Sequence, residues 1–166
     1  MSFWPKDIED AARAIIEDFS ARGLTVATAE SCTAGLIAGA LTEIAGSSSV
    51  FDRSFVTYSN EAKQQMIGVC AETLKAHGAV SRPTALEMAE GALRQSGAAV
   101  TVAVTGIAGP GGGSPEKPVG LVHLAAARKD RETLHREMRY GDIGRSAVRL
   151  ATVRTALEML AEIGRD

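Results

Sequence analysis

Hydrophobic and polar positions follow two different periods along the chain, and these periods predict alternating helices and strands. Apolar residues recur every three or four positions from Ile8 to Phe19, which predicts an amphipathic helix that ends near Gly23. Similar apolar or alanine-rich stretches predict helices over 33–45, 60–67, 72–77, 83–95 and 144–163, with Asn60 expected to cap the second of these. Short β-branched or apolar runs predict strands over 24–28, 54–58, 98–105, 119–127 and 132–140.

The order of these elements predicts an α/β fold. Strands and helices alternate as far as the strand over 98–105, which is expected to be central, and the polar link over 128–131 joins the last two strands as a hairpin. We therefore expect a three-layer α/β/α sandwich with a mixed, mainly parallel sheet and a C-terminal hairpin. Residues 1–166 are expected to form a single domain, because 166 residues suit one domain.

Composition and charge narrow the range of partners. The formal net charge is −2, so no basic surplus exists to neutralise a nucleic-acid backbone, whereas a single small anion needs only one or two cations. Two cysteines favour a reducing compartment, and neither a signal peptide nor a membrane span is predicted, so we expect a cytoplasmic protein with no membrane contact. The alanine-rich helices leave faces that could pack against another subunit as a homo-oligomer.

Glycine and proline cluster in one predicted loop. Six of the 17 glycines and three of the five prolines lie between residues 106 and 120, directly after a predicted strand. The loop lacks the lysine of a P-loop and the helix that must follow a dinucleotide-binding fingerprint. A flexible linker is the alternative, although its prolines argue against flexibility. The loop is therefore a candidate ligand-binding loop at the end of a strand.

Two strand-to-helix junctions carry candidate chemistry. Ser31 lies where a hydroxyl could attack a carbonyl next to the N–H groups at the start of a helix, although Ser31 or Thr33 could equally be a helix cap. Cys32 is a rival nucleophile, although a small buried thiol is the more common use of such a residue. At the second junction, Lys63 falls in the first turn of a helix, where the dipole disfavours a cation, so it could accept a proton directly or through Tyr58. The alternative is a solvated surface lysine beside a half-buried tyrosine.

Other residues leave alternatives open. The three histidines show no metal-ligand spacing with the cysteines, and no Gly-x-Ser-x-Gly elbow is present, so lysine is the leading candidate base for serine chemistry. Arg145 at the start of the last helix could pair with a phosphate or carboxylate. It could also lie on the helix surface, as could Arg149 and Arg154.

Together these segments resemble the C-terminal domain of the competence/damage-inducible CinA family. The matching segments are 29–33, 58–63 with 67–69, 105–113 with 117–120, and 141–142 with Arg145, and they spread in order over nearly the whole chain. Stand-alone members of the family are nicotinamide-nucleotide amidohydrolases. One departure is Ala34, at a position where we expect the family to favour glycine; another is the absence of the larger N-terminal domain of full CinA proteins.

The resemblance implies hydrolysis of the carboxamide of nicotinamide mononucleotide, a small-molecule substrate, without a metal or organic cofactor. Its implied catalytic residues are Ser31 as nucleophile, assisted by Tyr58 and Lys63. The residues expected to line the substrate pocket are Thr33, Asn60, Thr105, Gly106, Ile107, Ala108, Gly109, Gly111, Gly112 and Arg145. The alternatives are a non-catalytic nucleotide-binding module that regulates competence or the DNA-damage response, and a structural α/β subunit without a pocket.

Overall fold

A five-stranded mixed sheet forms the middle of the molecule. The computed structural model describes residues 2–166. The strands are β1 (Val26–Glu30), β2 (Phe51–Val56), β3 (Val100–Gly106), β4 (Leu121–Arg128) and β5 (Leu134–Arg139). Their order is β2-β1-β3-β4-β5, with parallel pairing of β1 to β2 and β3, and antiparallel pairing of β4 to β3 and β5. Only β4 therefore runs against the other strands, which confirms the predicted mixed sheet, its central strand and its C-terminal hairpin.

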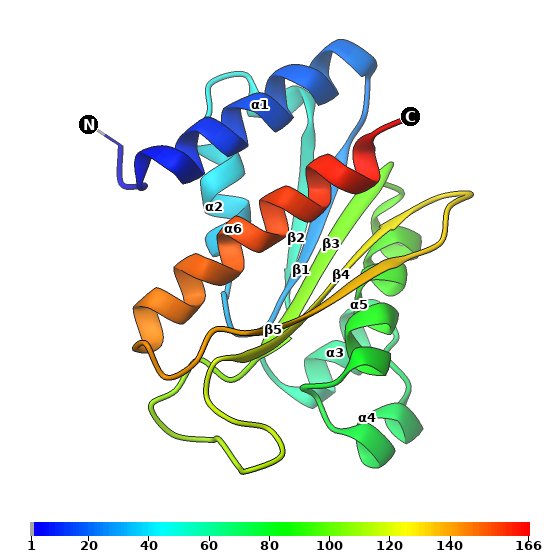
Figure 1. The fold of residues 1–166 in the computed structure, drawn as a ribbon. Helices are drawn as coiled ribbons and strands as arrows, with labels where there is room; N and C mark the ends of the chain where they lie inside the picture. Colours follow the sequence, from blue (N-terminus) through cyan, green and yellow to red (C-terminus); the bar gives the residue numbers. More distant parts are fainter. Residues whose placement is uncertain (1) are drawn as a thin grey trace.

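Helices cover both faces of the sheet, which confirms the three-layer prediction (Figure 1). On one face lie α1 (Lys6–Arg22), α2 (Leu36–Thr42) and α6 (Arg145–Gly164). On the other lie α3 (Asn60–Ile67), α4 (Ala71–His77) and α5 (Arg82–Ser96), and a short 3-10 helix spans Ser47–Ser49. Each face has its own apolar cluster, and alanines at the α5 face let that helix pack closely on the sheet. No helix formed by residues 2–166 is long and apolar enough to span a membrane.

One predicted helix start and one predicted helix cap were wrong. The helix expected from residue 33 begins at Leu36, because Ala34 and Gly35 take left-handed backbone angles, with φ of 47° and 97°. The helix expected to be capped by Asn60 is capped by Ser59, whose hydroxyl accepts from the Ala62 N–H at 3.0 Å. Tyr58, predicted at the end of a strand, lies just beyond β2.

The topology brings three strand ends together at one edge of the sheet. The chain passes from β1 outward to β2 and then returns to β3 on the other side of β1. These three strands are parallel, so their carboxyl ends lie side by side where the strand order reverses, which is the usual place for a ligand site in such sheets. Ser31, Tyr58 and the glycine-rich loop (residues 107–120) all follow these ends.

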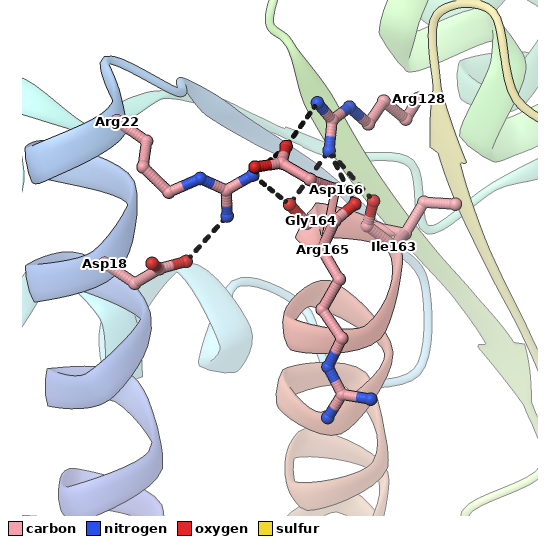
Figure 2. Close-up of polar contacts among 7 residues, drawn as sticks. All are labelled: Asp18, Arg22, Arg128, Ile163, Gly164, Arg165 and Asp166. Carbon is pink, nitrogen blue, oxygen red and sulfur yellow. Dashed lines mark hydrogen bonds and ion pairs between the residues drawn. The ribbon is translucent and has the colours of Figure 1, made fainter.

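Two arginines bind the C-terminal end of α6 (Figure 2). Arg128 donates to the carbonyl oxygens of Gly164 at 2.8 Å and Arg165 at 3.0 Å, and Arg22 donates to that of Gly164 at 2.7 Å and to the Asp166 carboxylate at 2.6 Å. The last carbonyls of a helix have no partner within the helix, so the guanidiniums satisfy them and oppose the negative end of the helix dipole. They fix α6 against α1 and β4, which in turn places the first turns of α6 beside the carboxyl ends of the strands.

Candidate functional site

The first element of the site is the Ser31 turn, residues 31–35, between β1 and α2. The Ser31 N–H donates to the Val104 carbonyl oxygen at 3.1 Å, which ties the turn to the central strand. Ala34 has a φ of 47°, a conformation in which a side chain costs free energy, so the expected preference for glycine at this position has a physical reason. The left-handed pair Ala34 and Gly35 redirects the chain and leaves Ser31 partly exposed at the edge of the sheet.

A buried carboxylate holds the turn from within. Glu30 is completely buried and accepts hydrogen bonds from the Thr33 hydroxyl at 2.6 Å and from the N–H groups of Gly35, Ile37 and Ala38 at 2.9, 3.1 and 2.9 Å. It therefore accepts from the N-cap residue of α2 and from two N–H groups of its first turn. The expectation that N–H groups at this helix start face a ligand was wrong, because those of Gly35, Ile37 and Ala38 donate to Glu30 and that of Leu36 donates to the Thr33 carbonyl oxygen.

Lys63 reaches the Ser31 hydroxyl directly. Its side chain is 1% exposed, and Nζ lies 3.0 Å from Ser31 Oγ and 2.8 Å from the carbonyl oxygen of Thr57. Among the ion pairs of residues 2–166, none involves Lys63. Burial lowers the pKa of its ammonium group below the usual value, because the charged form loses its hydration. A neutral amine at this position can accept the Ser31 proton without an intermediary.

Tyr58 and Arg145 stand at the mouth of the site. The Tyr58 side chain is 60% exposed, and its hydroxyl accepts a hydrogen bond from Arg145 Nη2 at 3.2 Å. Arg145 Nη1 donates to the Gly109 carbonyl oxygen at 2.9 Å, so one guanidinium joins the start of α6 to the glycine-rich loop. The Tyr58 hydroxyl has no hydrogen bond to Ser31 or Lys63 within the described chain, and the contact between Ser31 and Lys63 is direct.

These groups line a cavity of about 220 Å³. Eight of the predicted site residues line it: Ser31, Tyr58, Asn60, Lys63, Thr105, Gly106, Ala108 and Arg145. The remaining lining residues are Cys32, Ala79 and Val80. Residues from five separate stretches of the chain thus meet around the Ser31 hydroxyl.

The other five predicted pocket residues are not among those that line this cavity. The Thr33 hydroxyl donates to Glu30, so it is already committed within the turn. Gly111 and Gly112 line a neighbouring groove of about 620 Å³ between the glycine-rich loop and the residues after β5. Ile107 pairs its N–H with the Leu121 carbonyl oxygen, and Gly109 meets the site through the Arg145 contact.

Cys32 lines the cavity but is a poor nucleophile. It is 5% exposed, and burial raises the pKa of its thiol to about 11, which keeps it protonated at neutral pH. Within residues 2–166, no cluster of three or more metal-ligating side chains occurs. His123 and His135 stack and share a hydrogen bond of 3.0 Å, and neither lines this cavity.

Two charged residues that shape the Ser31 turn, Glu30 and Arg149, were not predicted as site residues. Glu30 ends a strand whose residues are all buried, and a carboxylate at such a position signals an internal partner that the chain must supply. The sequence allows both Arg149 and Arg154 to lie on the surface of the last helix. Arg154 does pair with Asp7 at the surface, but Arg149 donates to the carbonyl oxygens of Cys32 and Thr33 at 3.0 and 3.2 Å. No signal in the sequence distinguishes the two arginines.

Comparison with known proteins identifies the family of the chain. The CinA C-terminal domain matches residues 8–163. The chain belongs to the CinA C-terminal domain family. The resemblance predicted from the glycine-rich loop and the two strand-to-helix junctions is thereby confirmed.

Relatives of the chain include short and long CinA proteins. The nicotinamide-nucleotide amidohydrolase PncC of Escherichia coli (strain K12) is 57% identical over 141 residues, covering 84% of each chain. A putative competence-damage inducible protein of Symbiobacterium thermophilum is 56% identical over 126 residues, which cover 76% of this chain and 30% of that longer protein. The crystal structure of the competence/damage inducible protein CihA from Agrobacterium tumefaciens superposes with a TM-score of 0.98, at 68% identity over 99% of this chain and 100% of that one.

Proposed function

We propose that this CinA-family protein is an amidohydrolase that converts nicotinamide mononucleotide to nicotinate mononucleotide and ammonia. The observation that carries the proposal is the 3.0 Å contact between Ser31 Oγ and the buried Lys63 amine, which has no ion-pair partner within residues 2–166. A weak nucleophile needs an adjacent base, and a lysine with a lowered pKa can serve as that base. The name of the relative at 57% identity supplies the substrate class.

The reaction would proceed through an acyl-enzyme. Ser31 Oγ attacks the carboxamide carbon while neutral Lys63 takes the hydroxyl proton, and the C–N bond then breaks as Lys63 returns that proton to the departing amine, which leaves as ammonia. Water then attacks the ester, with Lys63 again taking the proton, and Ser31 leaves with its proton restored. Each cycle consumes one water and releases one carboxylic acid and one ammonia.

Two N–H groups of the Ser31 turn are free to stabilise the oxyanion. The N–H groups of Ser31, Ala34 and Leu36 donate to carbonyl oxygens, and those of Gly35, Ile37 and Ala38 donate to Glu30. Within the described residues, no oxygen accepts from the N–H of Cys32 or Thr33. We propose that these two amides receive the negative charge that develops on the carboxamide oxygen.

The rest of the substrate would extend toward the mouth of the cavity. The pyridine ring would enter the cavity of about 220 Å³, and the ribose phosphate would lie toward Arg145 and the glycine-rich loop. A planar guanidinium suits a phosphate, and glycine amides can approach it closely.

One phosphate needs few cations, which fits the net charge of −2 and argues against a nucleic-acid partner. The unpaired cysteines Cys32 and Cys70 fit a cytoplasmic setting.

Ammonia release from nicotinamide mononucleotide tests the proposal. We expect turnover by the wild type and a loss of about 10²–10⁴-fold in Lys63→Met, because general-base assistance is worth that much. Lys75→Met is the matched control, since Lys75 is an exposed lysine on α4, and its rate should equal that of the wild type. Tight binding of the mononucleotide by the wild type without ammonia release would overturn the proposal in favour of a regulatory nucleotide-binding module.

A further inference from the structure

An arginine side chain of α6 donates hydrogen bonds to backbone carbonyl oxygens of the Ser31 turn. Arg149 lies in the second turn of α6 and is partly buried. Its Nε donates to the Cys32 carbonyl oxygen at 3.0 Å, and its Nη2 donates to the Thr33 carbonyl oxygen at 3.2 Å. One rigid guanidinium thus holds two successive carbonyls across a sequence separation of 116–117 residues.

Both carbonyls are connected to the N–H groups proposed as oxyanion donors. The Cys32 carbonyl shares its peptide group with the Thr33 N–H. The Thr33 carbonyl shares its peptide group with the Ala34 N–H, which donates to the Ser31 carbonyl oxygen at 3.1 Å. The Ser31 carbonyl in turn shares its peptide group with the Cys32 N–H. Each of the two free amides is therefore the end of a hydrogen-bond chain that begins at Arg149.

Such a chain changes the strength of its last donor. A hydrogen bond to a carbonyl oxygen polarises the peptide group and strengthens its N–H as a donor, by roughly 10–30% per bond in condensed phase. A charged donor polarises more than a neutral one. The positive charge of Arg149 also affects the pKa of a group in the turn. Burial raises the pKa of the Cys32 thiol, and the nearby Arg149 guanidinium lowers it.

We infer that Arg149 is a positioning residue for the amide hydrolysis proposed above, and that it orients and polarises the Cys32 and Thr33 amides that stabilise the oxyanion. The inference rests on that proposed function. Arg149 acts through the backbone of the turn and makes no contact with the reacting atoms. The negative charge on the oxygen exists only in the tetrahedral intermediate and its transition states, so the effect of Arg149 falls on the rate of chemistry and leaves ground-state binding unchanged.

Steady-state kinetics of Arg149→Met separate this role from a merely structural one. Loss of an oxyanion-hole donor costs about 10²–10³-fold in kcat, and Arg149→Met weakens two donors without removing them. We therefore expect kcat for nicotinamide mononucleotide to fall by about 10–100-fold. KM and the dissociation constant of the product, nicotinate mononucleotide, should stay within about threefold of the wild type.

Arg154→Met is the matched control, because Arg154 lies on the same helix and pairs with Asp7 at the surface. It should leave kcat and KM unchanged. If Arg149→Met does not fold, Arg149→Lys carries the test: a single ammonium cannot hold both carbonyls in the same fork, so kcat should fall with an unchanged KM.

The outcomes distinguish the two proposals. Wild-type protein that binds the mononucleotide but releases no ammonia overturns the proposed function, and the inference with it. An active wild type with a folded Arg149→Met variant whose kcat is within twofold of it overturns the inference alone. A rise in KM with kcat unchanged also overturns it, because that pattern belongs to a residue that acts on substrate binding.

Discussion

Replacing Glu30 with glutamine tests whether the buried carboxylate holds the Ser31 turn. The amide keeps one acceptor oxygen and turns the other into an NH₂ donor. If the amide oxygen takes the place of Oε2, it retains the bonds from Thr33, Gly35 and Ile37. The NH₂ group then faces the Ala38 N–H, which donated to Oε1 at 2.9 Å in the native protein.

The magnitude follows from those contacts. A hydrogen bond to a charged group contributes about 1.5–3 kcal/mol, and an N–H left without an acceptor in a buried place costs about 1–3 kcal/mol. Because the three bonds to the retained oxygen also lose their charged acceptor, we expect Glu30→Gln to lower the free energy of unfolding by about 2–4 kcal/mol. For a chain of this length that corresponds to roughly 5–15 °C in Tm.

Chemical denaturation and thermal melting measure the effect, and ammonia release on the same samples measures its consequence for the turn. Glu43→Gln is the matched control, because Glu43 is an exposed glutamate at the end of the same helix, and its stability should change by less than about 0.5 kcal/mol. Equal unfolding free energies for Glu30→Gln and the wild type would refute the reasoning, since the turn would then be held by other contacts.

Three further predictions test separate parts of the account. Because the base must be neutral and burial lowers the Lys63 pKa, kcat/KM should rise with pH through that pKa and then level off; a rate that falls with rising pH over this range would contradict it. Iodoacetamide at neutral pH should label the exposed Cys70 and spare Cys32, whose thiol pKa is about 11, as peptide mass spectrometry of folded and denatured samples can report. Gly91→Ala should destabilise the protein by about 3 kcal/mol or more, because a Cβ there would lie 1.9 Å from a carbonyl oxygen at the end of α3, whereas Gly111→Ala, with open space around it, should melt with the wild type.

The hydrophobic pattern was sufficient for the layers and the sheet, because burial drives both. The apolar face of residues 8–19 and the β-branched run before residue 105 needed no tertiary information. The start of α2 could not be predicted in the same way. It depends on left-handed angles at Ala34 and Gly35 and on the acceptor that Glu30 supplies from the preceding strand.

The site residues, too, could be predicted from the sequence only in part. Ser31 and Lys63 were predicted from two strand-to-helix junctions, and the parallel strands bring those junctions together. Arg149 and Arg154 look alike in the sequence, five residues apart on one helix. Only the packing of α6 against the Ser31 turn gives one of them a backbone partner and leaves the other at the surface.

The most direct test of the central claim measures binding and turnover on a single variant, Ser31→Ala. The change removes the hydroxyl oxygen that lies 3.0 Å from Lys63 Nζ and leaves the cavity walls in place. If Ser31 is the nucleophile, Ser31→Ala binds nicotinamide mononucleotide within a few-fold of the wild-type affinity, and its ammonia release falls by about 10³-fold or more. Ammonia release within tenfold of the wild-type rate would contradict the claim, because the carbonyl would then be attacked by a group other than Ser31.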